Sequence, residues 1–289
     1  NGIGKTKFWR NTCNGISGVE RISSFDPTGL SCQIAGEVQD FNPNLVFICN
    51  YSHKHVSTAL PFLKNNTHLF IEKPLATSEK DLNRILKLNK KSKSITTVGF
   101  QERYNPCIKY IKKIINGINP NEIISAKFNW ETNLKSHRPY ENYKKSYASV
   151  KKFGGGVLHS LSHELDLIIH FFGMPKKVVG FKGKSSLKIN AEDSISAIFS
   201  YTNNFTVTLN LSFCYPKEKR EFSILTKNKL IRCDITKSKV DVIKNKKSIL
   251  SKKFILNRNK LFIAEVKDLL KSIKNKSRTS VPLNEGAKS

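Results

Sequence analysis

The first part of the chain alternates between short apolar runs and amphipathic segments. Residues 45–49 (LVFIC) are continuously apolar, which is typical of a strand buried on both faces of a parallel sheet. Across residues 78–90, leucine and isoleucine recur at helical spacing and predict an amphipathic helix. The same reasoning predicts further helices at 5–14, 55–63 and 106–116, and further strands at 19–24, 68–71 and 95–100. Strands and helices that alternate in this way favour a doubly wound parallel sheet.

The pattern changes at Asn119-Pro120. Residues 123–131 alternate as a half-buried strand, a polar loop with aromatic residues covers 132–153, and one helix is predicted over 157–172, closed by Gly173. Later segments predict strands at 177–182, 194–201, 205–213, 221–225 and 230–235, edge strands and turns over 237–253, and a helix over 261–273. We therefore expect a dinucleotide-binding domain over 1–119 and an α+β domain for substrate binding and oligomerisation over 120–289.

The bulk composition narrows the class of protein. The chain has 289 residues, of which 38% are hydrophobic, enough to build real cores. It contains no apolar run of about 18 residues and its first residues do not form a signal peptide, so no transmembrane helix is expected. Its six cysteines are scattered without a CxxC pair, which favours free thiols and a cytoplasmic location.

The chain is strongly basic, with 50 lysines and arginines against 22 acidic residues and a net charge of +28. Such a charge raises the question of nucleic-acid binding. The lysines are spread over nearly every segment, however, and no zinc-finger, helix-turn-helix or RNP pattern accompanies them. We interpret the charge as a compositional bias that attracts anionic ligands such as nucleotides, and we expect no specific nucleic-acid partner.

The start of the chain holds a weak phosphate-binding pattern. Gly2 and Gly4 could belong to a glycine-rich turn that brings the backbone close to a pyrophosphate at a helix N-terminus. Asp26 lies about 20 residues further on, where an acidic residue can bind the ribose 2′-hydroxyl of NAD. A turn residue before Pro27 is an equally good interpretation of Asp26.

Two further motifs carry possible chemistry. Glu72-Lys73-Pro74 follows a predicted strand and places a lysine at the carboxyl edge of the sheet, where such folds bind ligands. Further on, three glycines precede a predicted helix on which histidines and an aspartate share one face, namely His159, His163, Asp166 and His170. Three interpretations stay open for this face: a catalytic His163 that moves a proton, a metal site, or histidines that merely complete the helix.

With these motifs in this order, the chain resembles the Gfo/Idh/MocA oxidoreductases, the group of glucose–fructose oxidoreductase and inositol dehydrogenase. The resemblance rests on Asp26, the stretch 46–55, Glu72-Lys73-Pro74, the stretch 99–104 (GFQERY), and the glycine-rich turn that leads into His163-Glu-Leu-Asp166. It implies an N-terminal Rossmann domain, here without its first strand, and a C-terminal domain with an open, mostly antiparallel sheet. It also implies an NAD(P)-dependent enzyme that forms dimers or tetramers and contains no metal.

The resemblance also implies roles for individual residues. Lys73 would polarise the substrate hydroxyl beside the nicotinamide, and His163 would accept the proton while hydride passes between substrate and cofactor. Cofactor contacts would be Gly2, Gly4, Asp26, Asn50, His55, Glu72, Lys73 and Gln101. Substrate contacts would be Arg103, Tyr104, Arg138, Tyr143, His159 and Asp166.

A narrower resemblance concerns the substrate. His137-Arg-Pro, Tyr143, Ser146-Tyr147 and the segment that follows Gly156 are similar to a subset of the family that is suspected to act on sugars of surface glycans. This resemblance favours a nucleotide sugar or an amino sugar over inositol, with NAD as the expected cofactor and NADP as the alternative.

Two departures from the family pattern affect the expectation of activity. The chain begins within the glycine motif, and Ser160 stands where an acidic residue usually precedes the catalytic histidine. That residue would stabilise an imidazolium. Ser160 therefore supports a second hypothesis, a relative that binds the cofactor without turning over a substrate.

Overall fold

The computed structural model describes residues 5–17, 19–21, 23, 28, 33–35, 42–137, 142–184, 187–245 and 247–289. The chain divides into two compact units, Asn1–Asn44 and Leu45–Ser289, each of which we describe by itself. The smaller unit holds the helix α1 (Lys5–Cys13) and an antiparallel pair of short strands, β1 (Glu20–Arg21) and β2 (Ile34–Ala35). Within the predicted strand at 19–24, the described residues form β1, which pairs with β2. The predicted cofactor residues Gly2, Gly4 and Asp26 lie outside the described residues.

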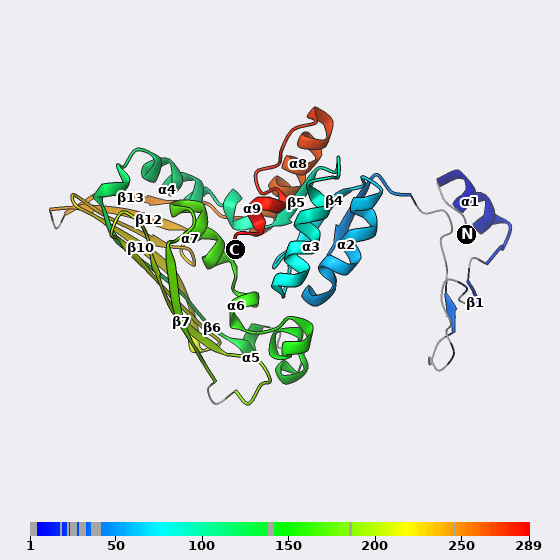
Figure 1. The fold of residues 1–289 in the computed structure, drawn as a ribbon, viewed down its shortest axis with the longest axis horizontal. Helices are drawn as coiled ribbons and strands as arrows, with labels where there is room; N and C mark the ends of the chain where they lie inside the picture. The colour runs from blue at the N-terminus through cyan, green and yellow to red at the C-terminus, as the bar shows by residue number, and fades with distance from the viewer. Residues whose placement is uncertain are drawn as a thin grey trace. The chain divides into compact units, whose positions relative to one another are not determined.

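A three-stranded parallel sheet opens the larger unit. Its strands β3 (Leu45–Ile48), β4 (His68–Glu72) and β5 (Thr96–Gly99) lie in that order. The helices α2 (His55–Lys64) and α3 (Glu79–Asn89) follow β3 and β4 and pack against each other (Figure 1). Ser78 caps α3 through its hydroxyl, which accepts a hydrogen bond of 3.2 Å from the Asp81 N–H. This arrangement confirms the predicted Rossmann-like sheet and places its carboxyl ends together.

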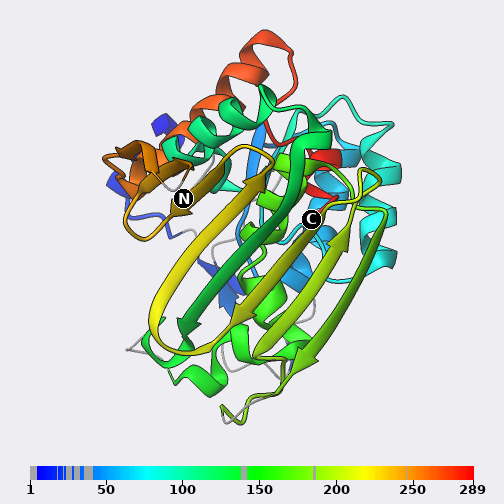
Figure 2. The same ribbon diagram turned by 90° about the vertical axis from the view of Figure 1, so that its left-hand side faces the viewer.

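The second sheet of the larger unit has eight strands in the order β13-β12-β11-β10-β6-β9-β8-β7 (Figure 2). Every neighbouring pair is antiparallel except β6 and β9, which are parallel. This sheet confirms the expected open and mostly antiparallel architecture. The strand bounds are β6 Ile123–Asn133, β7 Lys177–Gly183, β8 Ser194–Ser200, β9 Thr206–Ser212, β10 Cys214–Thr226, β11 Leu230–Asp234, β12 Lys239–Lys244 and β13 Lys247–Lys253.

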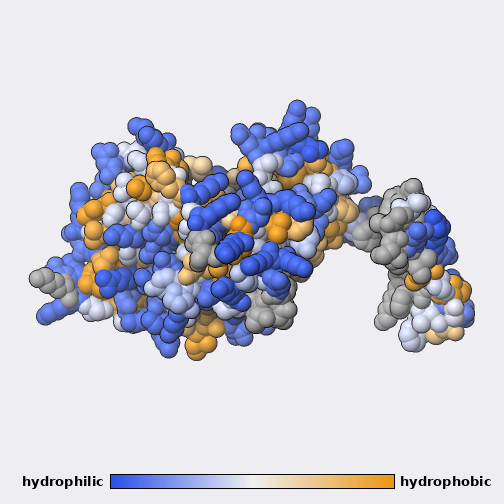
Figure 3. Space-filling model, turned by 90° about the horizontal axis from the view of Figure 1, so that it is seen from below, coloured by the Kyte–Doolittle hydropathy of each residue, from blue (hydrophilic) through white to orange (hydrophobic). Residues whose placement is uncertain are grey.

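Two hydrophobic clusters stabilise the larger unit. The larger cluster joins the eight-stranded sheet to α4 (Pro106–Asn116), α6 (Val157–Ser160) and α7 (His163–Phe172), with Phe128 of β6 stacked on Phe222 of β10 at 4.7 Å. The smaller cluster surrounds the parallel sheet. Hydrophilic residues cover most of the face seen in Figure 3 and apolar residues form separate patches there, as the dispersed lysines predict.

The end of the chain packs against the parallel sheet. After the helix α8 (Arg258–Asn275), the Val281 carbonyl accepts a hydrogen bond of 2.9 Å from the Val98 N–H on β5. Val281 and Leu283 are fully buried within the smaller cluster, and the short helix α9 (Leu283–Gly286) contacts β5. The domain boundary between residues 119 and 120 stays a prediction, but the last residues pack with the first part of the larger unit.

Three of the predicted elements differ from the structure. The helix predicted over 157–172 is interrupted at Leu161 and Ser162, so α6 and α7 are separate helices. The described parts of the loop at 132–153, residues 132–137 and 142–153, contain the one-turn helix α5 (Leu134–His137) and three 3₁₀ turns. Strand β10 begins at Cys214, before the predicted 221. The other predicted elements of the larger unit are present with ends within three residues. No helix in the described part of the chain is long and apolar enough to span a membrane.

Candidate functional site

Two adjoining cavities lie in the larger unit. The larger has a volume of about 700 Å³ and is lined by residues of the parallel sheet's edge, the loop 143–148, α6, α7, β6 and β10. The smaller, of about 450 Å³, lies at the carboxyl ends of β3 and β4. Ligands bind at this edge of open parallel sheets. Three residues line both cavities, namely Glu72, Lys73 and Tyr147. These residues mark the junction at which ligands in the two cavities would meet.

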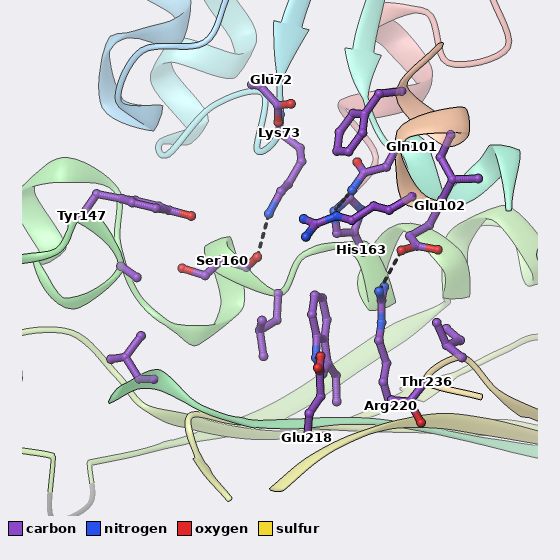
Figure 4. A pocket seen from close by; sticks show the side chains of 18 of the residues that line it. Glu72, Lys73, Gln101, Glu102, Tyr147, Ser160, His163, Glu218, Arg220 and Thr236 are labelled. Carbon is purple, nitrogen blue, oxygen red and sulfur yellow. Dashed lines mark hydrogen bonds and ion pairs between the residues drawn. The ribbon is translucent and has the colours of Figure 1, made fainter. Parts of the chain in front are cut away.

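Lys73 leaves the end of β4 and points into the larger cavity (Figure 4). Its Nζ donates a hydrogen bond of 2.6 Å to the Ser160 carbonyl oxygen, which fixes the ammonium across the junction. Burial lowers the pKa of Lys73 to about 8, and Arg220 adds to the lowering while Glu72 opposes it. Near neutral pH this lysine can therefore both give and take a proton.

His163 begins α7 and is 3% exposed. The Gln101 Nε2 lies 3.2 Å from the His163 Nε2, and because an amide nitrogen only donates, the ring proton is placed on Nδ1. Burial lowers the pKa of His163 well below its usual range, and the cations Lys73 and Arg220 lower it further. His163 is therefore a neutral ring at pH 7, and its Nδ1 has no hydrogen-bond partner among the described residues.

The glycine-rich turn holds the junction together. The Gly156 N–H donates a hydrogen bond of 2.8 Å to the Ala148 carbonyl, and a Cβ on Gly155 would overlap the Tyr147 carbonyl. Only glycine lets the two backbones approach so closely. The turn thereby fixes Tyr147 on one side and Ser160 on the other. The Ser160 hydroxyl is buried and has no partner within the described residues.

A buried ionic cluster forms one wall of the larger cavity. The Arg220 Nε donates to Glu164 at 2.6 Å and its Nη1 donates to Glu102 at 2.8 Å. The guanidinium lies over the Trp130 ring at 3.8 Å, which adds a cation–π contact. Burial raises the pKa of Glu164 to about 7 against the opposing effect of Arg220. Arg220 is thereby held between two carboxylates, with its side chain directed at Glu102 (Figure 4), and it lines the larger cavity.

Two family models cover most of the larger unit and part of the smaller one. An oxidoreductase family with an NAD-binding Rossmann fold matches residues 26–100, and the GFO/IDH/MocA C-terminal domain matches residues 122–232. The chain belongs to the Gfo/Idh/MocA family. YteT of Bacillus subtilis (strain 168) is 29% identical over 141 residues, which are 48% of this chain and 32% of YteT. Inositol 2-dehydrogenase of Salmonella typhimurium (strain LT2) is 24% identical over 220 residues, which are 70% of this chain and 62% of that enzyme. The chain thus spans about one third to two thirds of the length of these relatives.

Solved structures share the fold of this Gfo/Idh/MocA chain at low sequence identity. Levoglucosan dehydrogenase in complex with NADH and levoglucosan has a TM-score of 0.77 and 16% identity, with 84% of this chain and 74% of that chain covered. The WlbA dehydrogenase of Bordetella pertussis in complex with NADH and UDP-GlcNAcA has a TM-score of 0.71 and 18% identity, with coverage of 86% and 74%. These likenesses confirm the predicted fold.

The smaller cavity suits the nicotinamide end of the cofactor of this family. Its polar lining includes Asn50, Ser52 and Glu72, next to the Lys73 side chain. The predicted cofactor residue His55 also lines it, but its two ring nitrogens lie 2.8 and 3.0 Å from the Pro74 and Asn50 carbonyls. Carbonyls only accept, and burial lowers the pKa of His55, so the neutral ring donates to one of them. His55 therefore shapes the cavity by joining the ends of β3 and β4. The polar groups of Asn50, Ser52 and Glu72 fit a nicotinamide riboside.

Several predicted residues lie at the larger cavity and others do not. Gln101 and Tyr143 line it together with Lys73 and His163. Arg103, Tyr104, His159 and Asp166 line neither cavity. Arg138 lies outside the described residues.

Each of the four residues that line neither cavity contacts another group of the protein, and their predicted role as substrate contacts stays a prediction. Arg103 and Asp166 form a buried ion pair, with Nη2 and Oδ1 2.6 Å apart. The Tyr104 hydroxyl donates to Asp268 at 2.8 Å. The break between α6 and α7 separates His159 from the His163 face. The His159 Nδ1 instead lies 3.1 Å from the Gly154 carbonyl. No group of three metal-ligating side chains was found in the described part of the chain.

Arg220 and Trp130 line the larger cavity from β10 and β6 and were not identified from the sequence. Arg220 lies in the run Lys217-Glu-Lys-Arg220, which has the pattern of a solvated segment. One feature could have identified it: Arg220, Phe222 and Ile224 alternate along β10 and are all buried on one face. Other lining residues that were missed are Glu218, Thr236 and Arg258. Glu102 and Tyr147 lie in stretches that carry the family resemblance, but no role at the site was predicted for them.

Proposed function

We propose that this protein is an NAD-dependent oxidoreductase that transfers a hydride between the nicotinamide and a hydroxyl or carbonyl carbon of a sugar or nucleotide sugar. The observation that carries the proposal is the position of Lys73, which lines both cavities and is held at their junction by the Ser160 carbonyl. A reaction between a cofactor in one cavity and a sugar in the other requires a proton-transfer group at this position.

The residues of the chain divide the chemistry between them. Asn50, Ser52 and Glu72 would hold the nicotinamide riboside, and the bound nicotinamide supplies or accepts the hydride. Lys73 would exchange a proton with the reacting oxygen, because its pKa of about 8 lies close to neutral pH. His163 would orient that oxygen as a neutral ring, since three nearby cations and burial oppose an imidazolium. This division differs from the sequence-based prediction, in which His163 accepts the proton.

The narrower resemblance supports a nucleotide sugar of surface-glycan synthesis as the substrate. The larger cavity, at about 700 Å³, lies within the range of pockets that bind small molecules and has room for more than a single sugar ring. We also propose a cytoplasmic homo-oligomer. The edge strand β7 supports it, because Phe181 is 76% exposed and Val178 is 50% exposed there.

One observation favours a second candidate function, a relative that binds NAD without turnover. Ser160 replaces the expected acidic residue, and its hydroxyl and the His163 Nδ1 both lack partners among the described residues. A site that has lost its carboxylate could keep its cofactor and serve a regulatory role. The two functions differ in turnover and not in cofactor binding.

A turnover screen decides between these functions. The protein is incubated with NAD⁺ and a panel of sugars and nucleotide sugars, and with NADH and the corresponding keto sugars, while nicotinamide absorbance is followed. We expect turnover of at least one sugar, its loss in Lys73→Met and its reduction in His163→Ala. Lys127→Met is the matched control, because Lys127 is an exposed residue of β6. NADH binding without turnover of any sugar, or full activity of Lys73→Met, would contradict the proposal.

A further inference from the structure

Cations converge on the larger cavity. Lys73, Arg220 and Arg258 all line it. The same three side chains lower the pKa of His163, which lies among them, and no acidic group is prominent among the causes of that shift. The carboxylates of Glu72, Glu102 and Glu218 line the cavity as well, so the case for an anionic ligand rests on which cation keeps an unpaired donor.

Among the described residues, the guanidinium of Arg220 has one nitrogen without a hydrogen-bond partner. The arginine is 8% exposed, its Nε and Nη1 are engaged by Glu164 and Glu102, and Trp130 covers one face of the guanidinium. The remaining nitrogen, Nη2, is buried and has no partner in the described part of the chain. A buried donor without an acceptor is destabilising, and a ligand with an oxyanion would supply the missing acceptor.

The acidic residues near this cavity accept hydrogen bonds of their own, and two of them, Glu102 and Glu164, already hold Arg220. The Glu72 carboxylate accepts the Lys73 N–H at 3.0 Å, and Glu218 accepts the Trp130 indole N–H at 3.1 Å. Neither contact reaches the Arg220 Nη2. Arg258 lies at the exposed start of α8 and adds a second guanidinium on the cavity lining. Two guanidinium groups without a shared carboxylate are the arrangement that recognises carboxylates and phosphates.

On the basis of the proposed function, we propose that the larger cavity takes a sugar bearing an oxyanion, a carboxylate or a phosphate, held by the Arg220 Nη2 and by Arg258. The anion anchors the sugar against the Trp130 wall, and the sugar ring extends towards Lys73. The proposed substrate class is thereby narrowed from sugars and nucleotide sugars to those that present a carboxylate or a phosphate to these two arginines.

The chain carries its own reporter for this binding event. It has two tryptophans, and Trp9 lies in the smaller unit, so Trp9→Phe leaves Trp130 as the sole emitter beside Arg220. Glucuronate, glucose 6-phosphate and glucose are titrated at one fixed ionic strength while Trp130 fluorescence is followed. We expect saturable binding of at least one of the two anions, about tenfold tighter than glucose or more. The tighter anion identifies the oxyanion. Equal affinity for all three sugars, or binding of none, overturns the proposal.

Variants separate the site from general attraction to a basic protein. Arg258→Gln changes an exposed residue and is expected to weaken anion binding about tenfold without affecting glucose. Arg220→Lys, with thermal unfolding recorded in parallel, should abolish the preference for anions. The control Arg232→Gln removes an exposed arginine on β11 and should leave binding unchanged. An equal loss in Arg232→Gln would show non-specific attraction and refute the site. NADH binding is measured on the same samples by nicotinamide fluorescence. If the protein binds NADH but shows no preference for anionic sugars, only the oxyanion site is refuted. If it binds anionic sugars but not NADH, the proposed function is refuted.

Discussion

The ion pair between Arg103 and Asp166 provides the sharpest test of how the residues are divided between structure and chemistry. The Asp166 side chain is fully buried and that of Arg103 is 7% exposed, with contacts of 2.6, 2.9 and 3.2 Å between them. Burial raises the pKa of Asp166 even beside the guanidinium, so the net contribution of the pair is small. Removal of one partner is different, because it leaves an uncompensated charge. Asp166→Asn should therefore destabilise the protein by about 3–5 kcal/mol.

Urea unfolding followed by circular dichroism measures this loss, with NADH binding measured on the folded protein. Asp241→Asn is the control, because Asp241 forms an exposed ion pair with Lys239 and should cost less than about 1 kcal/mol. The structure predicts unchanged NADH binding for folded Asp166→Asn. A stability loss below about 1 kcal/mol, together with a raised KM for the sugar, would refute this reasoning and return Asp166 to the substrate contacts.

Three further predictions concern pH and close packing. Because burial lowers the pKa of Lys73 to about 8, its neutral form accumulates as pH rises, and NAD⁺ reduction should increase through pH 8 and level off above it. A rate that is flat between about pH 6 and about pH 9, a window that brackets this pKa, would contradict the prediction. Gly155→Ala should displace the Tyr147 turn and cost about 1–3 kcal/mol in urea unfolding, with reduced turnover. Gly286→Ala should cost a similar amount, because its Cβ would lie 2.5 Å from the valine of β5, whereas Gly117→Ala has room and should be neutral or better.

Local patterns in the sequence were sufficient for much of the fold. The apolar run of β3 and the amphipathic spacing of α3 predicted the parallel sheet, and the motif around Lys73 located its carboxyl edge. The packing of Val281 on β5 was not predictable, because it joins segments far apart in the chain and leaves no local pattern. The family resemblance, and not the periodicity, indicated the oxidoreductase class.

The candidate site was only partly predictable for similar reasons. His163 was found by its motif, but the break at Leu161 and Ser162 removed the shared face with His159, since helical spacing alone does not reveal where a helix is interrupted. Arg220 was missed because a buried arginine inside a charged run resembles its solvated neighbours. Its partners Glu102 and Glu164 come from other segments, and only the tertiary structure brings them together.

The most direct test of the central claim is a titration of the protein with NADH at moderate salt, followed by nicotinamide fluorescence, in wild type and in Asn50→Ala. The account predicts saturable binding to wild type, at least several-fold weaker in Asn50→Ala because the smaller cavity loses a polar wall. NADPH is titrated in parallel, and tighter binding of NADH would support the sequence-based prediction for Asp26. No saturable binding of either nucleotide would contradict the account, because the smaller cavity would then not be a nicotinamide site.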